Sequence, residues 1–180
     1  LMQSIIETLL RIARFENGSI AIKPAPLSIP ALFERLMDDT QVYAPYVSFD
    51  MHIEVQTVHT DAELLHHACT IIISNSVKFA GHHAHLMLSA EYDSKSGFYI
   101  ISIADNGPGI GEAALPHIFE RFYREDAAHV RSAGGAGLGL SIVKSIMHAL
   151  GGSVSAESGE RKGSVIIMQL PQNNIYEFFP

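Results

Sequence analysis

The sequence predicts an α+β fold, a two-layer sandwich in which a mixed sheet of about five strands packs on about three helices. The first observation is a hairpin. Residues 85–92 and 98–105 have strand patterns, and the turn-rich segment Asp93-Ser94-Lys95-Ser96-Gly97 joins them. The second observation is that helical segments with one apolar face are interleaved with hairpins rather than with single strands. This order disfavours a doubly wound parallel sheet.

Helical patterns and prolines divide the N-terminal region. Aliphatic side chains recur at helical spacing and stop at Asn17-Gly18, so residues 1–18 are expected to be the truncated end of a longer helix. Prolines interrupt the pattern in the next segment, and we expect residues 19–30 to form a linker with room for an edge strand. A second helix is predicted from Ala31 to about Thr40, at the start of a domain that spans residues 31–171.

The central region predicts a strand followed by a helix. Apolar and polar side chains alternate over residues 46–56, as in a half-buried strand. Thr60-Asp61-Ala62-Glu63 matches a capping box and opens a helix that runs to about Ala80. The apolar stripe of this helix is expected to contain Leu64, Ala68, Ile71, Ile72 and Phe79.

The C-terminal region predicts a loop, a helix and two strands. A short helical piece follows Gly109, and the polar residues 125–135 are expected to form a flexible loop. A helix is predicted over residues 137–150, and strands over 153–157 and 164–170 complete the domain. The final residues, 172–180, are expected to be a tail.

The composition limits the possible functions. The chain has 180 residues, of which 47% are apolar and 17% charged, so it can bury a core and wholesale disorder is excluded. The net charge of −7 and the lack of a basic run argue against nucleic acid as a partner. No apolar run approaches the length of a membrane span, and the single cysteine, Cys69, excludes a disulfide framework. We therefore expect a cytoplasmic location, without membrane contact by this part of the protein.

Asp105 is the first candidate functional residue. It lies on the same face of its predicted strand as Ile101 and Ile103, so its carboxylate is expected on the apolar side. There it could accept a hydrogen bond from an amino group such as the exocyclic amine of adenine, and Gly107 and Gly109 would allow close approach. Alternatively, the carboxylate caps its own Asp-Asn-Gly turn.

Asn75 and Lys78 are candidates on the helix before it. Asn75 lies on the expected apolar stripe, where an amide needs a partner. Its oxygen would suit Mg²⁺, and Lys78 could reach a phosphate. Alternatively, Asn75 is bonded to the backbone and Lys78 is solvated.

A glycine-rich segment, residues 134–139, directly precedes the last predicted helix. Backbone N–H groups at a helix N-terminus favour an anion, although glycine-rich linkers without such a role are common. The segment is not a Walker loop, because no Gly-Lys-Ser/Thr follows.

Aromatic and basic residues precede the polar loop. We expect Phe119, Phe122 and Tyr123 to pack together at one end of that loop. Arg121 and Arg124 are either solvated, or one of them reaches a transferring phosphoryl group. A further cluster of His82, His83 and His85 is either a metal site or a polar entry to the next strand.

Four segments, taken in this order, resemble the catalytic domain of bacterial sensor histidine kinases, which has the Bergerat fold and is related to DNA gyrase, MutL and heat-shock chaperone ATPases. Residues 74–79 resemble the N box, 105–110 the first glycine box, 118–124 the F box and 135–144 the second glycine box. The resemblance covers roughly residues 25–171, and residues 9–18 resemble the end of the second dimerisation helix of the family.

The resemblance implies a role for each matching position. Asp105 would bind the adenine amine, Asn75 would coordinate Mg²⁺, and Phe79 would lie against the base or ribose. Lys78 and Arg124 would contact phosphates, and with Asn75 they form the implied catalytic set. A mobile lid over residues 125–135 would cover the pocket. The remaining implied ATP-binding residues are Gly107, Gly109, Ile110, Phe119, Tyr123, Gly135, Gly137, Leu138, Gly139 and Leu140.

The resemblance also implies an activity and partners. ATP and Mg²⁺ would be the cofactors of a protein-histidine kinase that transfers the γ-phosphoryl group to a histidine on a dimerisation domain, for relay to a response regulator. The parent protein would be a homodimer, with anchoring in the inner membrane as one arrangement.

Two departures from the family pattern leave an alternative open. Ile71 stands where the family usually has asparagine, and no histidine is followed by the phosphoacceptor pattern. We therefore expect no phosphorylation site within this chain. The alternative is an ATP-sensing pseudokinase that binds ATP without transferring phosphate.

Overall fold

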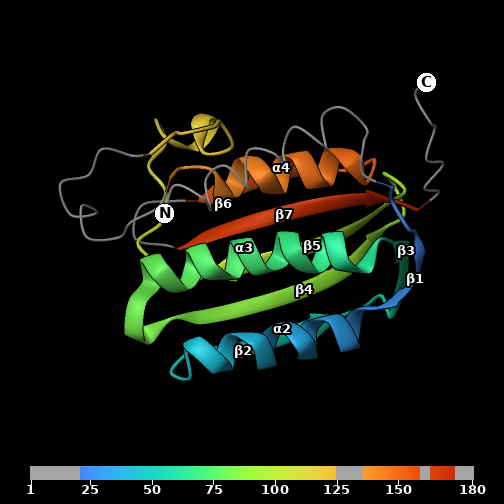
Figure 1. Ribbon diagram of the computed structural model, residues 1–180, viewed down its shortest axis with the longest axis horizontal. Coiled ribbons are helices and arrows are strands. Elements are labelled where there is room, and N and C mark those ends of the chain that lie inside the picture. Colours follow the sequence, from blue (N-terminus) through green and yellow to red (C-terminus); the bar gives the residue numbers. More distant parts are fainter. Residues whose placement is uncertain (1–20, 125–135, 159–162, 173–180) are drawn as a thin grey trace.

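The computed structural model describes residues 21–124, 136–158 and 163–172. Its main sheet is mixed and five-stranded, with β2 parallel to β4 and the other neighbours antiparallel. The α+β sandwich predicted from the sequence is confirmed (Figure 1). In spatial order, the strands are β2 (Ser48–Ile53), β4 (His85–Asp93), β5 (Phe98–Asp105), β7 (Ser164–Pro171) and β6 (Ser153–Ser158).

Three helices lie side by side on one face of this sheet, as Figure 1 shows: α2 (Ile29–Tyr43), α3 (Ala62–Ala80) and α4 (Gly139–Ala149). The middle helix, α3, contacts both of the others. The core lies between the helices and the sheet, where burial of large aliphatic and aromatic side chains stabilises the fold. Its largest fully buried members include Phe33, Leu36, Leu65, Ile72, Leu88, Ile101, Ile103 and Ile146.

The structure also contains a two-stranded sheet, of which the sequence indicated only one strand, within residues 19–30. β1 (Ala25–Ser28) pairs antiparallel with β3 (Thr57–Thr60). The predicted single strand over residues 46–56 is wrong in length, because β2 ends at Ile53 and the chain then turns into β3. β3 was not predicted, because a strand of four residues is too short to show a clear alternation of apolar and polar side chains.

The start of α3 differs from the predicted capping box. A capping box would place the cap at Thr60, but Thr60 ends β3 and the cap is Asp61. One Asp61 carboxylate oxygen accepts from the Leu64 N–H at 3.1 Å, and the other accepts from the Lys23 N–H at 2.8 Å. Asp61 therefore holds both the start of α3 and the chain that precedes β1.

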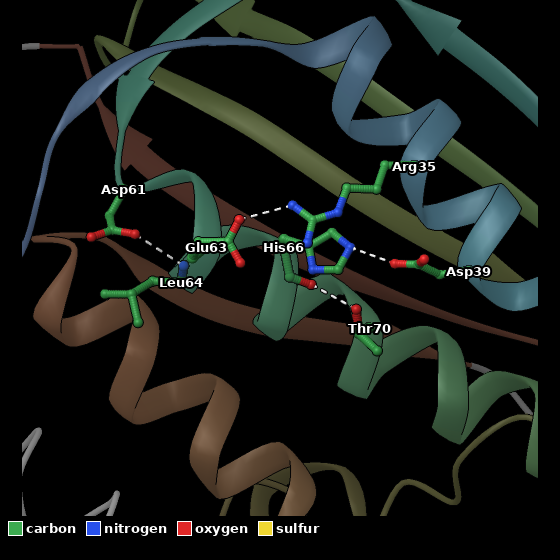
Figure 2. Close-up of polar contacts among 7 residues, drawn as sticks. All are labelled: Arg35, Asp39, Asp61, Glu63, Leu64, His66 and Thr70. Atoms are coloured by element: carbon green, nitrogen blue, oxygen red, sulfur yellow. Dashed lines mark hydrogen bonds and ion pairs between the residues drawn. The ribbon is translucent and has the colours of Figure 1, made fainter.

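Polar contacts join α2 to α3 (Figure 2). Arg35 Nη1 lies 2.8 Å from Glu63 Oε1, and His66 Nε2 lies 3.0 Å from Asp39 Oδ2. The Arg35 pair is exposed and contributes little to stability, because water and salt screen such charges. Most of the attachment of α3 therefore comes from its buried apolar face.

The remaining elements are short. The expected helical piece after Gly109 is a 3₁₀ turn, η2 (Leu115–His117), and η1 (Gly81–His83) follows α3. α2 begins at Ile29, capped by Ser28, and so starts inside the segment predicted as a linker. None of the helices in the described parts of the chain combines the length and apolarity that a bilayer crossing requires.

Candidate nucleotide-binding site

The elements that carry Asn75, Asp105 and Gly139 meet at one end of the sandwich. The C-terminal half of α3, the end of β5, the start of β7 and the start of α4 come together there, on the left in Figure 1. Two contacts define this junction. Asp105 on β5 is the register partner of Ser164 on β7, and Gly139 on α4 lies against Ile71 and Asn75 of α3.

Four hydrogen-bond donors surround the Asp105 carboxylate. Oδ2 accepts from the Ser76 hydroxyl at 3.0 Å and from the Ser164 hydroxyl at 2.6 Å. Oδ1 accepts from the Gly107 N–H at 2.8 Å and from the Ser164 N–H at 3.3 Å. Oδ1 thus caps the turn that follows Asp105, as one of the two interpretations predicted. Oδ2 instead joins α3 to β7, which a turn cap alone does not explain.

Ser76 and Ser164 were missed as site residues. Ser76 lies inside the segment that resembles the N box, directly after Asn75, and its position was the only available signal. Ser164 opens a predicted strand, but its contact with Asp105 depends on the β5–β7 register, and a strand pattern in the sequence does not reveal its pairing partner.

Asn75 is half-buried opposite the start of α4. A Cβ atom at Gly139 would lie 3.2 Å from Ile71 Cγ2 and 3.4 Å from Asn75 Nδ2, so a side chain at Gly139 would crowd both residues. Among the residues that the structure describes, none hydrogen-bonds the Asn75 amide. An amide oxygen in this setting fits Mg²⁺, which accepts hard oxygen ligands and is commonly bound through one or two protein groups plus phosphates.

Lys78 lies in the last turn of α3. The pKa of Lys78 lies below its ordinary value, because burial disfavours the ammonium and because the positive charge of Arg124 is close. Lys78 Nζ also lies 5.3 Å from the centre of the Phe79 ring. Phe79 was expected on the buried stripe of α3, and that prediction is wrong, because its side chain is 51% exposed. The last turn of α3 therefore presents Lys78 and Phe79 outward, beside the site.

The F box and the second glycine box meet through the backbone. The Phe122 N–H donates to the Gly137 carbonyl at 2.8 Å. Gly137 has φ +68, and a Cβ atom there would lie 2.8 Å from the Phe122 carbonyl carbon and from Tyr123 O, so only glycine fits. Residues 125–135, predicted to form a lid, connect these two segments. They lie outside the described residues, and Gly135 of the predicted site is among them.

The predicted packing of Phe119, Phe122 and Tyr123 is partly wrong. Phe119 packs against the core, and the Tyr123 ring lies 5.5 Å from the His117 ring. Phe122 instead is 60% exposed. Its φ of 64 turns the chain in the left-handed region, so its side chain leaves the cluster.

The first glycine box is held on the β6–β7 hairpin. The Ile110 N–H donates to Ser158 Oγ at 2.7 Å, and Ser158 Oγ donates to the Gly163 carbonyl at 2.8 Å. Gly109 has φ 82, a conformation that glycine adopts without strain. These contacts place the loop after Asp105 along one side of the site.

The N-terminus of α4 forms another side. Leu138 is the cap residue; it is buried and provides no side-chain hydrogen bond to the cap. Gly139 and Leu140 begin the helix, and the Ser141 hydroxyl donates to the Leu138 carbonyl at 2.8 Å. The first turn of α4 thus has backbone N–H groups without a side-chain cap, an arrangement that favours anions.

The histidine cluster does not form a metal site in the described parts of the chain, where no three His, Cys, Asp or Glu side chains are placed to share an ion. His85 lies 2.9 Å from Ser48 Oγ and 3.2 Å from Asp50 Oδ2, and the His82 ring contacts that of Tyr46. These contacts favour the other interpretation of the three histidines, a polar entry to strand β4.

Comparison with known proteins agrees with this geometry. The family described as histidine kinase-, DNA gyrase B- and HSP90-like ATPase matches residues 60–174. Sensor histidine kinase YkoH of Bacillus subtilis is 32% identical over 96% of this chain and 37% of its own length. Sensor histidine kinase WalK of the same organism is 29% identical over 94% of this chain and 28% of its own length. The chain thus spans about a third of the length of these relatives.

A solved structure has the same fold. Full-length ShkA in complex with AMPPNP superimposes with a TM-score of 0.82 at 26% identity, over 94% of this chain and 35% of that chain. Together with the ordered motifs and their meeting at one end of the sheet, these matches show that the chain belongs to the family of histidine kinase-, DNA gyrase B- and HSP90-like ATPases.

Proposed function

We propose that this chain is the ATP-binding catalytic part of a sensor histidine kinase and transfers the γ-phosphoryl group of ATP to a histidine on a dimerisation domain. The observation that carries the proposal is the Asp105 carboxylate, held by donors from α3, β7 and its own loop. Lys78 lies on the same helix as Ser76, and burial together with the charge of Arg124 lowers its pKa. One end of the site thus offers an acceptor for a base, and the other offers positive charge.

Asp105 is the proposed determinant of base selectivity. An ionised carboxylate only accepts hydrogen bonds, so it pairs with the exocyclic amine of adenine. Guanine has a carbonyl oxygen at the corresponding position, which the carboxylate would repel. Phe79, exposed beside the site, is proposed to lie against the base or ribose. Gly107, Gly109 and Ile110 are proposed to line the adenine end.

Lys78, Arg124 and the first turn of α4 are the proposed phosphate-binding groups. Burial and the charge of Arg124 both lower the pKa of Lys78, and a bound triphosphate would offset both effects by stabilising the ammonium. Asn75 is the proposed Mg²⁺ ligand, and the ion would supply charge stabilisation at the phosphates when bound. Gly137, Leu138, Gly139 and Leu140 would supply backbone contacts, and Phe119 and Tyr123 would support the loop that carries Arg124.

The proposed reaction is an in-line transfer. The bond between the γ-phosphorus and the β,γ-bridging oxygen breaks, ADP leaves with that electron pair, and a phosphorus–nitrogen bond forms to the acceptor histidine. Positioning and charge stabilisation by Lys78 and Arg124 would supply the catalysis. The acceptor histidine would belong to the dimerisation domain of a homodimeric parent, and a response regulator would receive the phosphoryl group next. We place this part of the protein in the cytoplasm, with the parent anchored in the inner membrane.

The test is phosphotransfer to a supplied acceptor. The chain is incubated with γ-labelled ATP, Mg²⁺ and a separately purified histidine-bearing dimerisation hairpin from the parent kinase. We expect label on the hairpin, and we expect the Asn75→Ala variant to abolish it while the variant still unfolds cooperatively. If the chain binds ATP but no label reaches the hairpin, the result would instead support the pseudokinase alternative, for which Ile71 is the sequence argument.

A further inference from the structure

We infer that Ser76 is a positioning residue that orients the Asp105 carboxylate toward the adenine amine. It would thereby raise selectivity for adenine without touching the nucleotide. This inference rests on the proposed function, because it assigns a supporting residue to the adenine end of the same site.

The hydroxyl of Ser76 is used differently from other helix hydroxyls in the described residues. Thr40, Thr70 and Ser145 each donate to a carbonyl of their own helix, four residues earlier. The Ser76 hydroxyl instead donates across to Asp105 Oδ2 at 3.0 Å, which joins α3 to β5 over 29 residues of sequence. A helix serine can bond a carbonyl of its own helix, so the bond across to Asp105 is one of the arrangements open to Ser76 and the one that the structure shows.

Burial makes this hydrogen bond consequential. Ser76 is 5% exposed, between the apolar residues of α3 that face the sheet. A hydroxyl buried at such a position is unfavourable unless it is hydrogen-bonded, and Asp105 supplies its acceptor. The carboxylate in turn gains a donor that is attached to a rigid helix rather than to a loop.

The orientation of the carboxylate depends on donors to both oxygens. The side-chain torsion that rotates an aspartate carboxylate has a broad energy minimum, so packing alone does not fix it. Oδ1 is held by the N–H groups of Gly107 and Ser164, whereas Oδ2 is held by the hydroxyls of Ser76 and Ser164. Without Ser76, Oδ2 keeps one donor, and fewer contacts hold the plane of the carboxylate that would meet an incoming amine.

The experiment compares two nucleotides that differ only in the amine. Titration calorimetry with Mg²⁺ measures the affinity of the chain for the β,γ-imido triphosphates of adenosine and of purine riboside, which lacks the amine. Ser76→Ala is compared with Ser76→Thr, which keeps a hydroxyl, and with Thr70→Val, which removes a hydroxyl from the same helix away from Asp105. Thermal unfolding of each variant verifies that it is folded.

We expect Ser76→Ala to weaken the adenosine analogue about tenfold, the lower end for a hydrogen bond to a charged group, and to leave the purine riboside analogue within about twofold. Ser76→Thr should restore adenosine binding, and Thr70→Val should change neither affinity. An equal loss for both nucleotides, or no loss for the adenosine analogue, would overturn the inference. A wild-type chain that binds neither nucleotide would overturn the proposed function and this inference with it.

Discussion

Asp105→Asn separates the structural and the binding roles of one side chain. The amide can keep its oxygen toward the backbone N–H groups of Gly107 and Ser164, which cannot reverse their polarity. Its NH₂ group then faces the hydroxyls of Ser76 and Ser164, and each hydroxyl can rotate to accept instead of donate. All four hydrogen bonds thus persist in the free protein, but without the charge.

The two roles predict effects of different size. A hydrogen bond to a charged group contributes about 1 kcal/mol more than a neutral one, and the neutral amide costs less to bury, so we expect a net loss of about 1–2 kcal/mol in unfolding free energy. Adenine binding should fall by about 2 kcal/mol or more, at least about thirtyfold, because the amide presents a donor to the amine of the base.

The assay is calorimetric titration of the wild-type chain and Asp105→Asn with the β,γ-imido analogues of ATP and GTP, beside urea unfolding. Asp93→Asn is the matched control, because Asp93 also accepts from a serine hydroxyl and a backbone N–H in a turn but lies at the β4–β5 hairpin, at the opposite end of β5 from Asp105. We expect the control to bind as the wild type does. Adenine affinity in Asp105→Asn within threefold of the wild type would refute the assignment of Asp105 as the base acceptor.

Three further predictions concern stability and the loop junction. Asp61→Ala should lower the unfolding free energy by about 1–2 kcal/mol, because it removes the cap of α3. Glu63→Ala is the control at an exposed ion pair and should leave urea unfolding unchanged. Equal effects of the two substitutions would contradict the assignment of Asp61 as the cap. Gly137→Ala should weaken binding of the ATP analogue and lower the unfolding free energy by about 1 kcal/mol or more, because its Cβ would meet the Phe122 backbone; unchanged calorimetry and unfolding would count against this contact. Burial raises the pKa of the Cys69 thiol from 9.0 to about 12, so the buried thiol stabilises the folded chain below about pH 9 and this stabilisation is lost as the pH rises toward 12. Urea unfolding at pH 8 and pH 10 should therefore show a steeper alkaline loss in the wild type than in Cys69→Ala, and equal slopes would argue against burial of the thiol.

Long periodic segments could be predicted from the sequence, and short or conformation-dependent ones could not. The β4–β5 hairpin and the helix from Ala62 to Ala80 each extend over many residues, so their periods are unambiguous. β3, with four residues, and the choice of Asp61 over Thr60 as the cap depend on where β1 pairs. The exposure of Phe122 depends on a positive φ, for which the sequence carries no signal at a phenylalanine.

The candidate site divides in the same way. The sequence singles out Asp105, Asn75 and Lys78, because polar groups beside apolar patterns need partners. The order of the motifs then predicted that these residues belong to one nucleotide-binding site. The partners themselves come from the tertiary structure. Ser164 reaches Asp105 through the β5–β7 register, and Ser76 does so through the packing of α3 on the sheet.

The sequence by itself therefore determined the fold class, the long helices and the long strands, because these depend on local periodicity. The order of motifs along the chain also determined which kinds of side chain the candidate site contains. Only the tertiary structure decided which donors hold the Asp105 carboxylate, and that the backbone of the F box bonds to Gly137. The physical reason is that these contacts join residues far apart in sequence, and their geometry follows from strand register and helix packing, which no local pattern encodes.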